Sequence, residues 1–313
     1  MKILVTGASG FIGSAVVADL AARGHTVLAA SRNPERSLPG GVIPFAVQPP
    51  LSNVDWVPAL RDVEAVIHLA GLAHRAARRN RLLEDELTAV NVTATHQLHR
   101  AASAAGVGRF IFVSSLAAVT SRSLGTVDSA TACCPTTPYG ASKRAAELAV
   151  AEHQRNGGCD FTIIRPPLIY GRGNPANMAR LLSLVRSGVP LPFASLHNRR
   201  SFLYLGNLCD ILDRCLEAPA ARNATFLVSD DDDVSTPTLV RTIAEVLGSP
   251  ARLFPFPTAV FDALNRLRPD SALAKLTGSL QVDCTPLWRA LDWQPKHTLA
   301  AGMRAAFSTG AHS

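Results

Sequence analysis

The sequence lacks any hydrophobic run that could cross a membrane as a helix. Its longest uncharged stretch, residues 37–54, contains four prolines and therefore cannot form one continuous helix. The apolar N-terminus superficially resembles a signal peptide, but Gly7, Gly10, Gly13 and Asp19 interrupt it. We therefore predict a cytoplasmic protein with no membrane partner.

Cysteine patterns typical of metal sites or disulfides are also missing. None of the six cysteines forms a C-x-x-C pair, and their spacing is not that of metal ligands. The adjacent Cys133 and Cys134 could join each other only under strain. Reduced thiols and no metal site are therefore predicted.

No long basic tract accompanies the formal net charge of +7, and aromatic residues do not interleave with the arginines. The arginines are scattered, apart from small clusters at Arg75, Arg78, Arg79 and Arg81 and at Arg199 and Arg200. This distribution argues against a nucleic-acid partner. The positive charge instead favours attraction of a small anionic molecule such as a nucleotide.

The apolar content of 47% is spread over short segments that alternate between strand and helix patterns. Strand patterns occupy residues 2–6, 25–30, 65–69, 109–114, 161–165 and 225–228, and helical patterns occupy residues 11–23, 84–105, 138–151, 177–188 and 207–217. This alternation predicts an α/β fold, a Rossmann-type doubly wound parallel sheet covered by helices. A smaller, mostly helical C-terminal region follows residue 230. We assign residues 1–168 and 201–229 to dinucleotide binding, and residues 169–200 and 230–313 to substrate binding.

A glycine-rich turn joins the first strand to the first helix. Residues 7–13 read Gly-Ala-Ser-Gly-Phe-Ile-Gly, a G-x-x-G-x-x-G spacing. Glycines let the backbone turn sharply and approach a pyrophosphate, and the helix N-terminus supplies amide donors. The turn predicts a dinucleotide site that includes Gly7, Ser9, Gly10, Phe11, Ile12 and Gly13.

The residues that follow the second strand bear on the choice of cofactor. Ser31 and Arg32 stand where an acidic residue would bind the adenosine ribose hydroxyls of NAD. An arginine can pair bidentately with a 2′-phosphate, so the cofactor is predicted to be NAD(P), with NADP favoured. An ordinary exposed arginine at a strand end is the alternative interpretation.

A tyrosine and a lysine lie one helical turn apart in the sequence Tyr139-Gly-Ala-Ser-Lys143, so both project from one helix face. A neighbouring ammonium and the positive charge of a nicotinamide are expected to lower the tyrosine pKa, which makes the hydroxyl usable as a general acid or base. The strand before this helix ends at Ser114 and Ser115, and Ser115 could bind the reacting oxygen. Ser115, Tyr139 and Lys143 are therefore the predicted catalytic residues.

Together these segments resemble the extended short-chain dehydrogenase/reductase family, the nucleotide-sugar epimerases, dehydratases and reductases. The resemblance covers nearly the whole chain and rests on residues 7–13, 68–71, 91–95, 114–115, 139–143, 165–171 and 200–207. It implies that the cofactor also contacts Leu69, Ala70, Gly71, Tyr139, Lys143 and Pro166. It implies a UDP-linked or dTDP-linked sugar as substrate, whose diphosphate is held by Asn177 and one of Arg199 or Arg200. A homodimer is possible.

The resemblance also indicates which of the family's reactions to expect. The 4,6-dehydratases of the family carry an acid pair just after the catalytic hydroxyl, whereas Ser115 is followed by Leu116 and Ala117. Passages 174–178, 198–204 and 225–237 look like the subgroup that reduces UDP-4-keto-6-deoxy-N-acetylglucosamine to UDP-N-acetylquinovosamine for O-antigen or exopolysaccharide synthesis. One departure is Pro50, which stands where relatives usually carry an aspartate that recognises adenine.

Three functions stay open from the sequence. A 4-keto reductase is favoured because Arg32 suits an exchangeable NADPH. A UDP-hexose 4-epimerase needs the same catalytic residues but retains a tightly bound NAD. A non-catalytic dinucleotide-sensing protein is the third, although such proteins commonly lose the Tyr139 and Lys143 pair.

Overall fold

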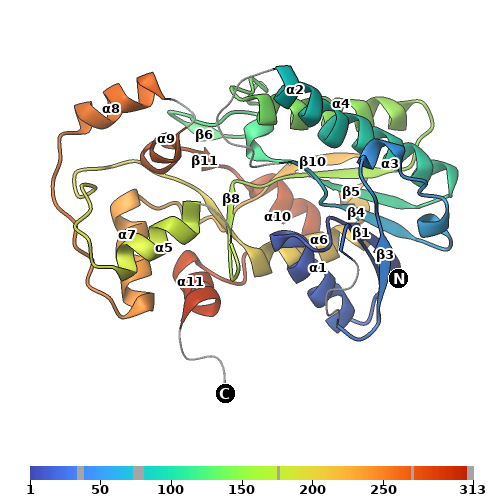
Figure 1. Cartoon of the computed structure of the whole chain (residues 1–313), viewed down its shortest axis with the longest axis horizontal. Coiled ribbons are helices and arrows are strands. Elements are labelled where there is room, and N and C mark those ends of the chain that lie inside the picture. The colour runs from blue at the N-terminus through green and yellow to red at the C-terminus, as the bar shows by residue number, and fades with distance from the viewer. Residues whose placement is uncertain (34–38, 73–80, 175–176, 269–270, 309–313) are drawn as a thin grey trace.

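A parallel sheet of seven strands frames the described part of the molecule (Figure 1). This computed structural model describes residues 1–33, 39–72, 81–174, 177–268 and 271–308. The strand order is β10-β7-β5-β4-β1-β2-β3. The strands are β1 Lys2–Thr6, β2 Thr26–Ser31, β3 Val42–Ala46, β4 Ala65–His68, β5 Arg109–Val113, β7 Phe161–Arg165 and β10 Ala224–Leu227. The chain winds outward from β1 in both directions, which confirms the predicted doubly wound sheet and places its switch point between β1 and β4.

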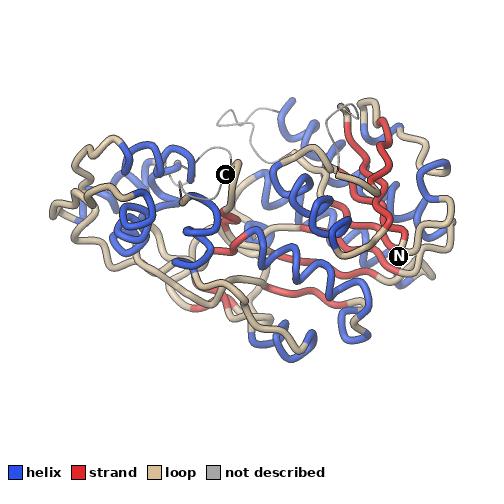
Figure 2. The backbone as a smooth tube through the Cα atoms, turned by 90° about the horizontal axis from the view of Figure 1, so that it is seen from below, coloured by secondary structure: helices blue, strands red, loops and turns tan. Residues whose placement is uncertain are grey.

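Helices cover both faces of this sheet (Figures 1 and 2). The α-helices of the described residues, some of which lie beside the sheet rather than on it, are α1 Phe11–Ala22, α2 Arg81–Leu87, α3 Ala94–Ala104, α4 Pro138–Arg155, α5 Asn177–Arg186, α6 Leu205–Glu217, α7 Thr236–Leu247, α8 Thr258–Leu267, α9 Ala272–Thr277, α10 Thr285–Leu291 and α11 Leu299–Phe307. Side chains alternate along β1: Ile3 and Val5 pack in the same core cluster as α1 and α6, whereas Leu4 packs with α3 and α4. Both faces are therefore dry, as a parallel sheet requires.

The seventh strand, β3, is an element that the sequence analysis missed. Pro44 lies in its middle, and the prolines of residues 37–54 concealed the strand pattern. Proline cannot donate a ladder hydrogen bond, so within sheets it is confined mainly to edge strands. The position of β3 at the edge, paired only with β2, satisfies that restriction.

The long helix predicted over residues 84–105 is present as a continuous helical run over residues 81–104, but it is not α-helical throughout. A π-helical segment, Thr88–Thr93, separates α2 from α3. A π-turn holds one extra residue and is frequent at functional sites. It shifts the face on which Asn91 lies, with consequences described below.

Beside the sheet lies a helix-rich part that contains α5, α7, α8, α9 and α11 (Figures 1 and 2). Two small parallel pairs join it to the rest: β8 (Leu168–Tyr170) with β9 (Phe202–Tyr204), and β6 (Thr126–Val127) with β11 (Gln281–Val282). None of the described helices is long and apolar enough to cross a membrane. The proposed division between dinucleotide-binding and substrate-binding residues stays a prediction.

Two sequence features fall outside the described residues. These are Arg75, Arg78 and Arg79 of the basic cluster, and residues 175–176 in one of the passages that point to the reductase subgroup.

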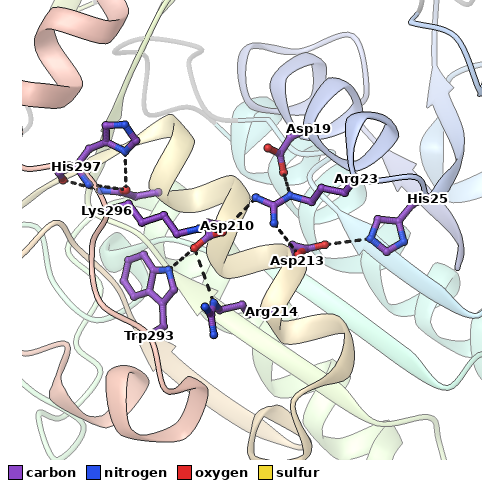
Figure 3. Close-up of polar contacts among 10 residues, drawn as sticks. Asp19, Arg23, His25, Asp210, Asp213, Arg214, Trp293, Lys296 and His297 are labelled. Atoms are coloured by element: carbon purple, nitrogen blue, oxygen red, sulfur yellow. Dashed lines mark hydrogen bonds and ion pairs between the residues drawn. The ribbon is translucent and has the colours of Figure 1, made fainter.

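The segment that follows α10 is tied to α6 and α1 by one buried carboxylate (Figure 3). Asp210 accepts hydrogen bonds from Trp293 Nε1 at 2.6 Å, Lys296 Nζ at 2.7 Å and Arg23 Nη2 at 3.1 Å. Arg23 continues the network to Asp213 at 2.9 Å. The end of α1, helix α6 and the segment after α10, which are distant in sequence, are therefore held together by the Asp210 carboxylate.

Candidate active site

The predicted cofactor residues converge where the carboxyl ends of β1 and β4 meet. Gly7 follows β1 with φ +69°, a conformation that L side chains rarely adopt. A Cβ atom at Gly7 would lie 2.8 Å from the backbone nitrogen of Ala70, which follows β4. The two loops are therefore in direct backbone contact, which is possible only with glycine at this position.

The start of α1 has the properties of an anion site. Its N-cap is Gly10, which is exposed and provides no capping side chain. The unpaired amides of a first helical turn and its dipole favour a phosphate group. Ser9, Phe11 and Ile12 surround this turn, and buried Gly13 packs against the carbonyl of Gly7. The residues present therefore fit a dinucleotide pyrophosphate.

The residues predicted to select the cofactor lie at the end of β2, which pairs with β1 on the side opposite β4. Ser31 is buried at the end of β2, and Arg32 is exposed directly after it. Pro50 is also exposed, before a short 3₁₀ turn at Leu51–Asn53. An exposed guanidinium is available to a 2′-phosphate, but its position does not by itself distinguish NADP from NAD, so the preference for NADP stays a prediction.

Lys143 lies almost completely buried on α4. Its Nζ donates a 3.0 Å hydrogen bond to the carbonyl of Val113 at the end of β5. The same atom stands 4.6 Å from the centre of the Phe112 ring. Burial lowers the pKa of Lys143 to about 8, against the opposing effect of the Glu147 carboxylate. The ammonium is therefore fixed beside the strand that delivers Ser115.

Tyr139 and Ser115 meet at the same edge of the sheet. Burial raises the pKa of the Tyr139 hydroxyl, and the neighbouring Ser115 side chain acts in the opposite direction. The predicted lowering of this pKa includes the positive charge of a bound nicotinamide, and it stays a prediction. The contact itself depends on Gly140, where a Cβ would lie 2.1 Å from the carbonyl of Ala117. This close approach brings the first turn of α4 onto the loop after Ser115.

Asn91 is a site residue to which the sequence analysis gave no role. Its amide nitrogen donates to Ser142 Oγ at 2.9 Å and to the Leu72 carbonyl at 3.2 Å, and its Oδ1 accepts from Leu72 N at 2.7 Å. Ser142 Oγ in turn donates to the Tyr139 carbonyl at 2.8 Å. The π-helical turn thus clamps the loop after β4 to α4. Its only signal in the sequence is its place among the family-like segments.

His68 received no role from the sequence, and its contacts agree with that. The Thr95 hydroxyl donates to the Asn91 carbonyl, so it accepts from His68 Nε2 at 2.8 Å. His68 Nδ1 then accepts from the Thr6 hydroxyl at 2.7 Å. Burial, with a smaller effect of Lys143, lowers the pKa of His68 to about 3. The imidazole is therefore neutral and structural.

The predicted substrate residues lie on other segments. Arg200 is buried, and burial lowers its pKa to about 10; its Nη1 donates to the Gly278 carbonyl at 2.9 Å. Arg199 is exposed, and half-buried Asn177 begins α5. The structure thus separates the two arginines, which the sequence treated as equivalent. Buried Pro166, the remaining predicted cofactor residue, accepts a 2.8 Å hydrogen bond from Leu116 N.

The loop after Ser115 carries no acid pair. Leu116 is buried in an apolar cluster, and Ala117 donates its backbone N–H to Ser115 Oγ at 3.2 Å. A leaving hydroxyl would find no proton donor on these two residues. The predicted exclusion of a 4,6-dehydratase therefore rests on their side chains.

Comparisons with known proteins agree with this architecture. The NAD dependent epimerase/dehydratase family matches residues 3–228. The chain is 33% identical to UDP-glucose 4-epimerase of Vibrio cholerae over 310 residues, which is 97% of this chain and 93% of the relative. It is 28% identical to 2-alkyl-3-oxoalkanoate reductase of Stenotrophomonas maltophilia, over 97% of this chain and 98% of the relative.

A solved structure shares the fold. The UDP-glucuronic acid 4-epimerase from Bacillus cereus in complex with NAD superposes with a TM-score of 0.79 at 21% identity, over 98% of this chain and 95% of that one. The family match and the relative from Vibrio cholerae both extend well beyond the glycine-rich turn. The chain belongs to the NAD dependent epimerase/dehydratase family.

Proposed function

We propose that this chain is an NAD(P)-dependent reductase that acts on C4 of a 4-keto nucleotide sugar. The substrate that fits best is a UDP-4-keto-6-deoxy-N-acetylhexosamine, whose reduction gives UDP-N-acetylquinovosamine for O-antigen or exopolysaccharide synthesis. The buried ammonium of Lys143, held at the end of β5 on the same helix as Tyr139 and beside the segment that carries Ser115, carries the proposal. This arrangement suits proton transfer to an oxygen whose carbon gains a hydride.

Each residue then has one part in the reaction. The turn from Gly7 to Gly13 holds the dinucleotide pyrophosphate, and a bound reduced nicotinamide supplies the hydride. Ser115 orients the C4 carbonyl, and Tyr139 donates the proton to the oxygen as negative charge develops there. Lys143 stabilises the tyrosinate that remains, because its ammonium is fixed at the end of β5.

The anionic half of the substrate is assigned to Arg200. This guanidinium is buried against a backbone carbonyl and has a lowered pKa, with no ion pair to a carboxylate among the described residues. A buried cation without a counter-charge is costly, and a diphosphate would offset that cost. Exposed Arg199 and Asn177, at the start of α5, are the further candidates for this contact.

A 4-epimerase is the second candidate, favoured by the 33% identity to UDP-glucose 4-epimerase over nearly the whole chain. The two reactions differ in cofactor use. A reductase releases its oxidised coenzyme in every turnover, whereas an epimerase returns the hydride to the same sugar. Arg32, exposed at the end of β2, favours the reductase because it suits the 2′-phosphate of an exchangeable NADPH.

The deciding assay mixes the protein with UDP-4-keto-6-deoxy-N-acetylglucosamine and follows loss of reduced-nicotinamide absorbance, with NADPH and NADH in separate reactions. Stoichiometric oxidation, faster with NADPH, is the expected result. Replacement of Tyr139 by Phe keeps the ring but removes the proton donor, so turnover should fall on the order of 10²–10⁴-fold. Dinucleotide affinity, measured by fluorescence titration, should change little in that variant.

Three outcomes would overturn the proposal. No oxidation of either coenzyme, together with NAD that copurifies with the protein and interconversion of UDP-hexoses, would establish the epimerase. Unchanged turnover in the Tyr139→Phe variant would remove Tyr139 from the reaction. Dinucleotide binding without turnover on any nucleotide sugar would instead favour a sensing protein.

A further inference from the structure

We propose that Glu147 is a positioning residue that holds the catalytic ammonium of Lys143 in its charged form at the end of β5. Glu147 lies one turn beyond Lys143 on α4 and is 1% exposed. The effect on turnover rests on the proposed function. The effect on the charge of Lys143 does not, and it can be measured on its own.

The Glu147 carboxylate connects three elements. Its Oε1 accepts from Ser114 Oγ at 2.6 Å and from Arg165 Nε at 2.9 Å. Its Oε2 accepts from Arg165 Nη2 at 2.7 Å and from Arg144 Nη1 at 3.1 Å. Ser114 stands between Val113, which binds the Lys143 ammonium, and Ser115. The carboxylate thereby fixes α4 to the strand ends that carry the catalytic groups.

Lys143 needs such a partner because its surroundings disfavour charge. It is 4% exposed, packs over the Phe112 ring and has a neutral carbonyl as its hydrogen-bond acceptor. The titratable and charged groups around it are Tyr139 and Glu147 on α4, His68 on β4 and, beyond Glu147, Arg144 and Arg165. Glu147 is the one carboxylate in that set.

The bidentate ion pair between Glu147 and Arg165 provides a test, because removal of the two partners should move the pKa of Lys143 in opposite directions. Both partners contribute to packing, so the loss of either would loosen α4. Their charges act oppositely on Lys143. The Glu147 carboxylate stabilises the ammonium, whereas the positive Arg165 guanidinium partly cancels that stabilisation. If Glu147 has a purely structural role, the pKa of Lys143 should shift in the same direction in both variants. If its role is electrostatic, the two shifts should have opposite directions.

Lysine-selective ¹³C labelling gives a direct measurement, because the chain has only four lysines: Lys2, Lys143, Lys275 and Lys296. The Cε resonance of each reports its ionisation by NMR, and a Lys143→Met variant assigns the signal of interest. In Glu147→Gln the Lys143 titration should move down by about 1–2 pH units. In Arg165→Met it should move up by roughly half a unit or more.

Arg144→Met is the matched control for the arginine variant. Arg144 also contacts Glu147, but 33% of its side chain is exposed, so solvent screens its charge. Its removal should move the titration by less than about 0.3 units. Glu147→Asp retains the charge at a greater distance and should give a downward shift smaller than that of Glu147→Gln, which decides the question if the Gln variant does not fold.

Shifts of the same sign in the Glu147 and Arg165 variants, or no shift in either glutamate variant, would overturn the proposal. The kinetic consequence is a separate readout. In Glu147→Gln the alkaline limit of kcat/KM should move to lower pH, with activity regained as the buffer is acidified. If the Lys143 titration shifts as expected but the protein does not turn over any keto sugar, the proposed role of Glu147 stands and the proposed reductase function is refuted.

Discussion

Gly7 and Gly24 share a left-handed backbone but differ in their surroundings. Gly7 has φ +69° and lies against the backbone of Ala70, whereas Gly24 has φ +85° and open space where a Cβ would lie, with nothing within 4 Å. An alanine in this conformation costs roughly 1–2 kcal/mol at either position, because its Cβ approaches the following carbonyl oxygen. Only at Gly7 must the loops of β1 and β4 also move apart.

Replacement of each glycine by alanine separates these effects. The Gly24→Ala variant should lose roughly 1–2 kcal/mol in free energy of unfolding, measured in urea, and the Gly7→Ala variant should lose more, because its Cβ also meets the backbone of Ala70. The Gly7→Ala variant should in addition lose dinucleotide affinity on the order of tenfold or more, because the pyrophosphate turn is displaced. Equal affinities in the two variants would contradict the assignment of Gly7 to the cofactor site.

The sequence predicts which of the candidate residues come together where the signal is local. Tyr139 and Lys143 share a helix, and Ser115 follows the end of β5, so simple spacing brings them to one sheet edge. It fails where tertiary packing decides. Nothing in the adjacent Arg199 and Arg200 indicates that only the second is buried, and the raised pKa of Tyr139 depends on burial that no motif records.

At the scale of elements, helix α6 connects the sheet to the segment after α10 (Figure 3). Asp210 and Asp213 both bind Arg23, but their environments differ. The Asp210 side chain is 6% exposed and also accepts from Trp293 and Lys296, whereas that of Asp213 is 22% exposed. Removal of a buried partner leaves its donors unpaired, whereas water can replace an exposed one.

Asp210→Ala and Asp213→Ala should therefore differ in stability despite their shared partner. We expect Asp210→Ala to lose about 3–5 kcal/mol in free energy of unfolding. Asp213→Ala should lose less than about 1 kcal/mol. Urea unfolding followed by tryptophan fluorescence measures both. A loss in the Asp213 variant as large as that in the Asp210 variant would show that Arg23, not Asp210, holds the C-terminal segment.

Elements were predictable where hydrophobic periodicity was unbroken. β1 and β7 have their predicted bounds, and α1 differs only at its last residue. β3 was concealed by Pro44, which is tolerable because it lies at the sheet edge. The π-helical turn before α3 was also unpredictable, because its reason is the tertiary clamp that Asn91 makes to Leu72 and Ser142.

At the scale of the whole molecule, stability should depend on pH through buried groups far from the site. His99 on α3 is fully buried; its Nε2 donates to the Cys159 carbonyl at 3.1 Å, and its Nδ1 lies 3.0 Å from His153 Nδ1. Burial lowers the pKa of His99 from 6.5 to about 4, opposed by the Cys159 bond and assisted by His153 and His96. The neutral imidazole is therefore the form that the fold requires.

The direction of the pH effect follows from that lowered pKa. Between pH 6.5 and about 4 the unfolded chain binds a proton at His99 that the folded chain does not, so stability falls on acidification. Asp230 acts oppositely: burial raises its pKa from 3.8 to about 6, so the folded chain binds the extra proton in that window. The curve of unfolding free energy against pH contains both effects. The contribution of His99 is therefore isolated by comparison of the wild type with a variant that lacks this imidazole.

His99→Gln retains an amide donor for the Cys159 carbonyl but cannot titrate. From pH 7 to pH 5 the wild-type chain should lose roughly 2 kcal/mol more unfolding free energy than this variant. Exposed His197→Gln provides the matched control and should follow the wild-type curve. Parallel curves for the wild type and His99→Gln would mean that His99 takes up its proton in the folded chain as readily as in the unfolded chain. The bond to His153 would then have to break on acidification, because two protonated rings cannot share that contact.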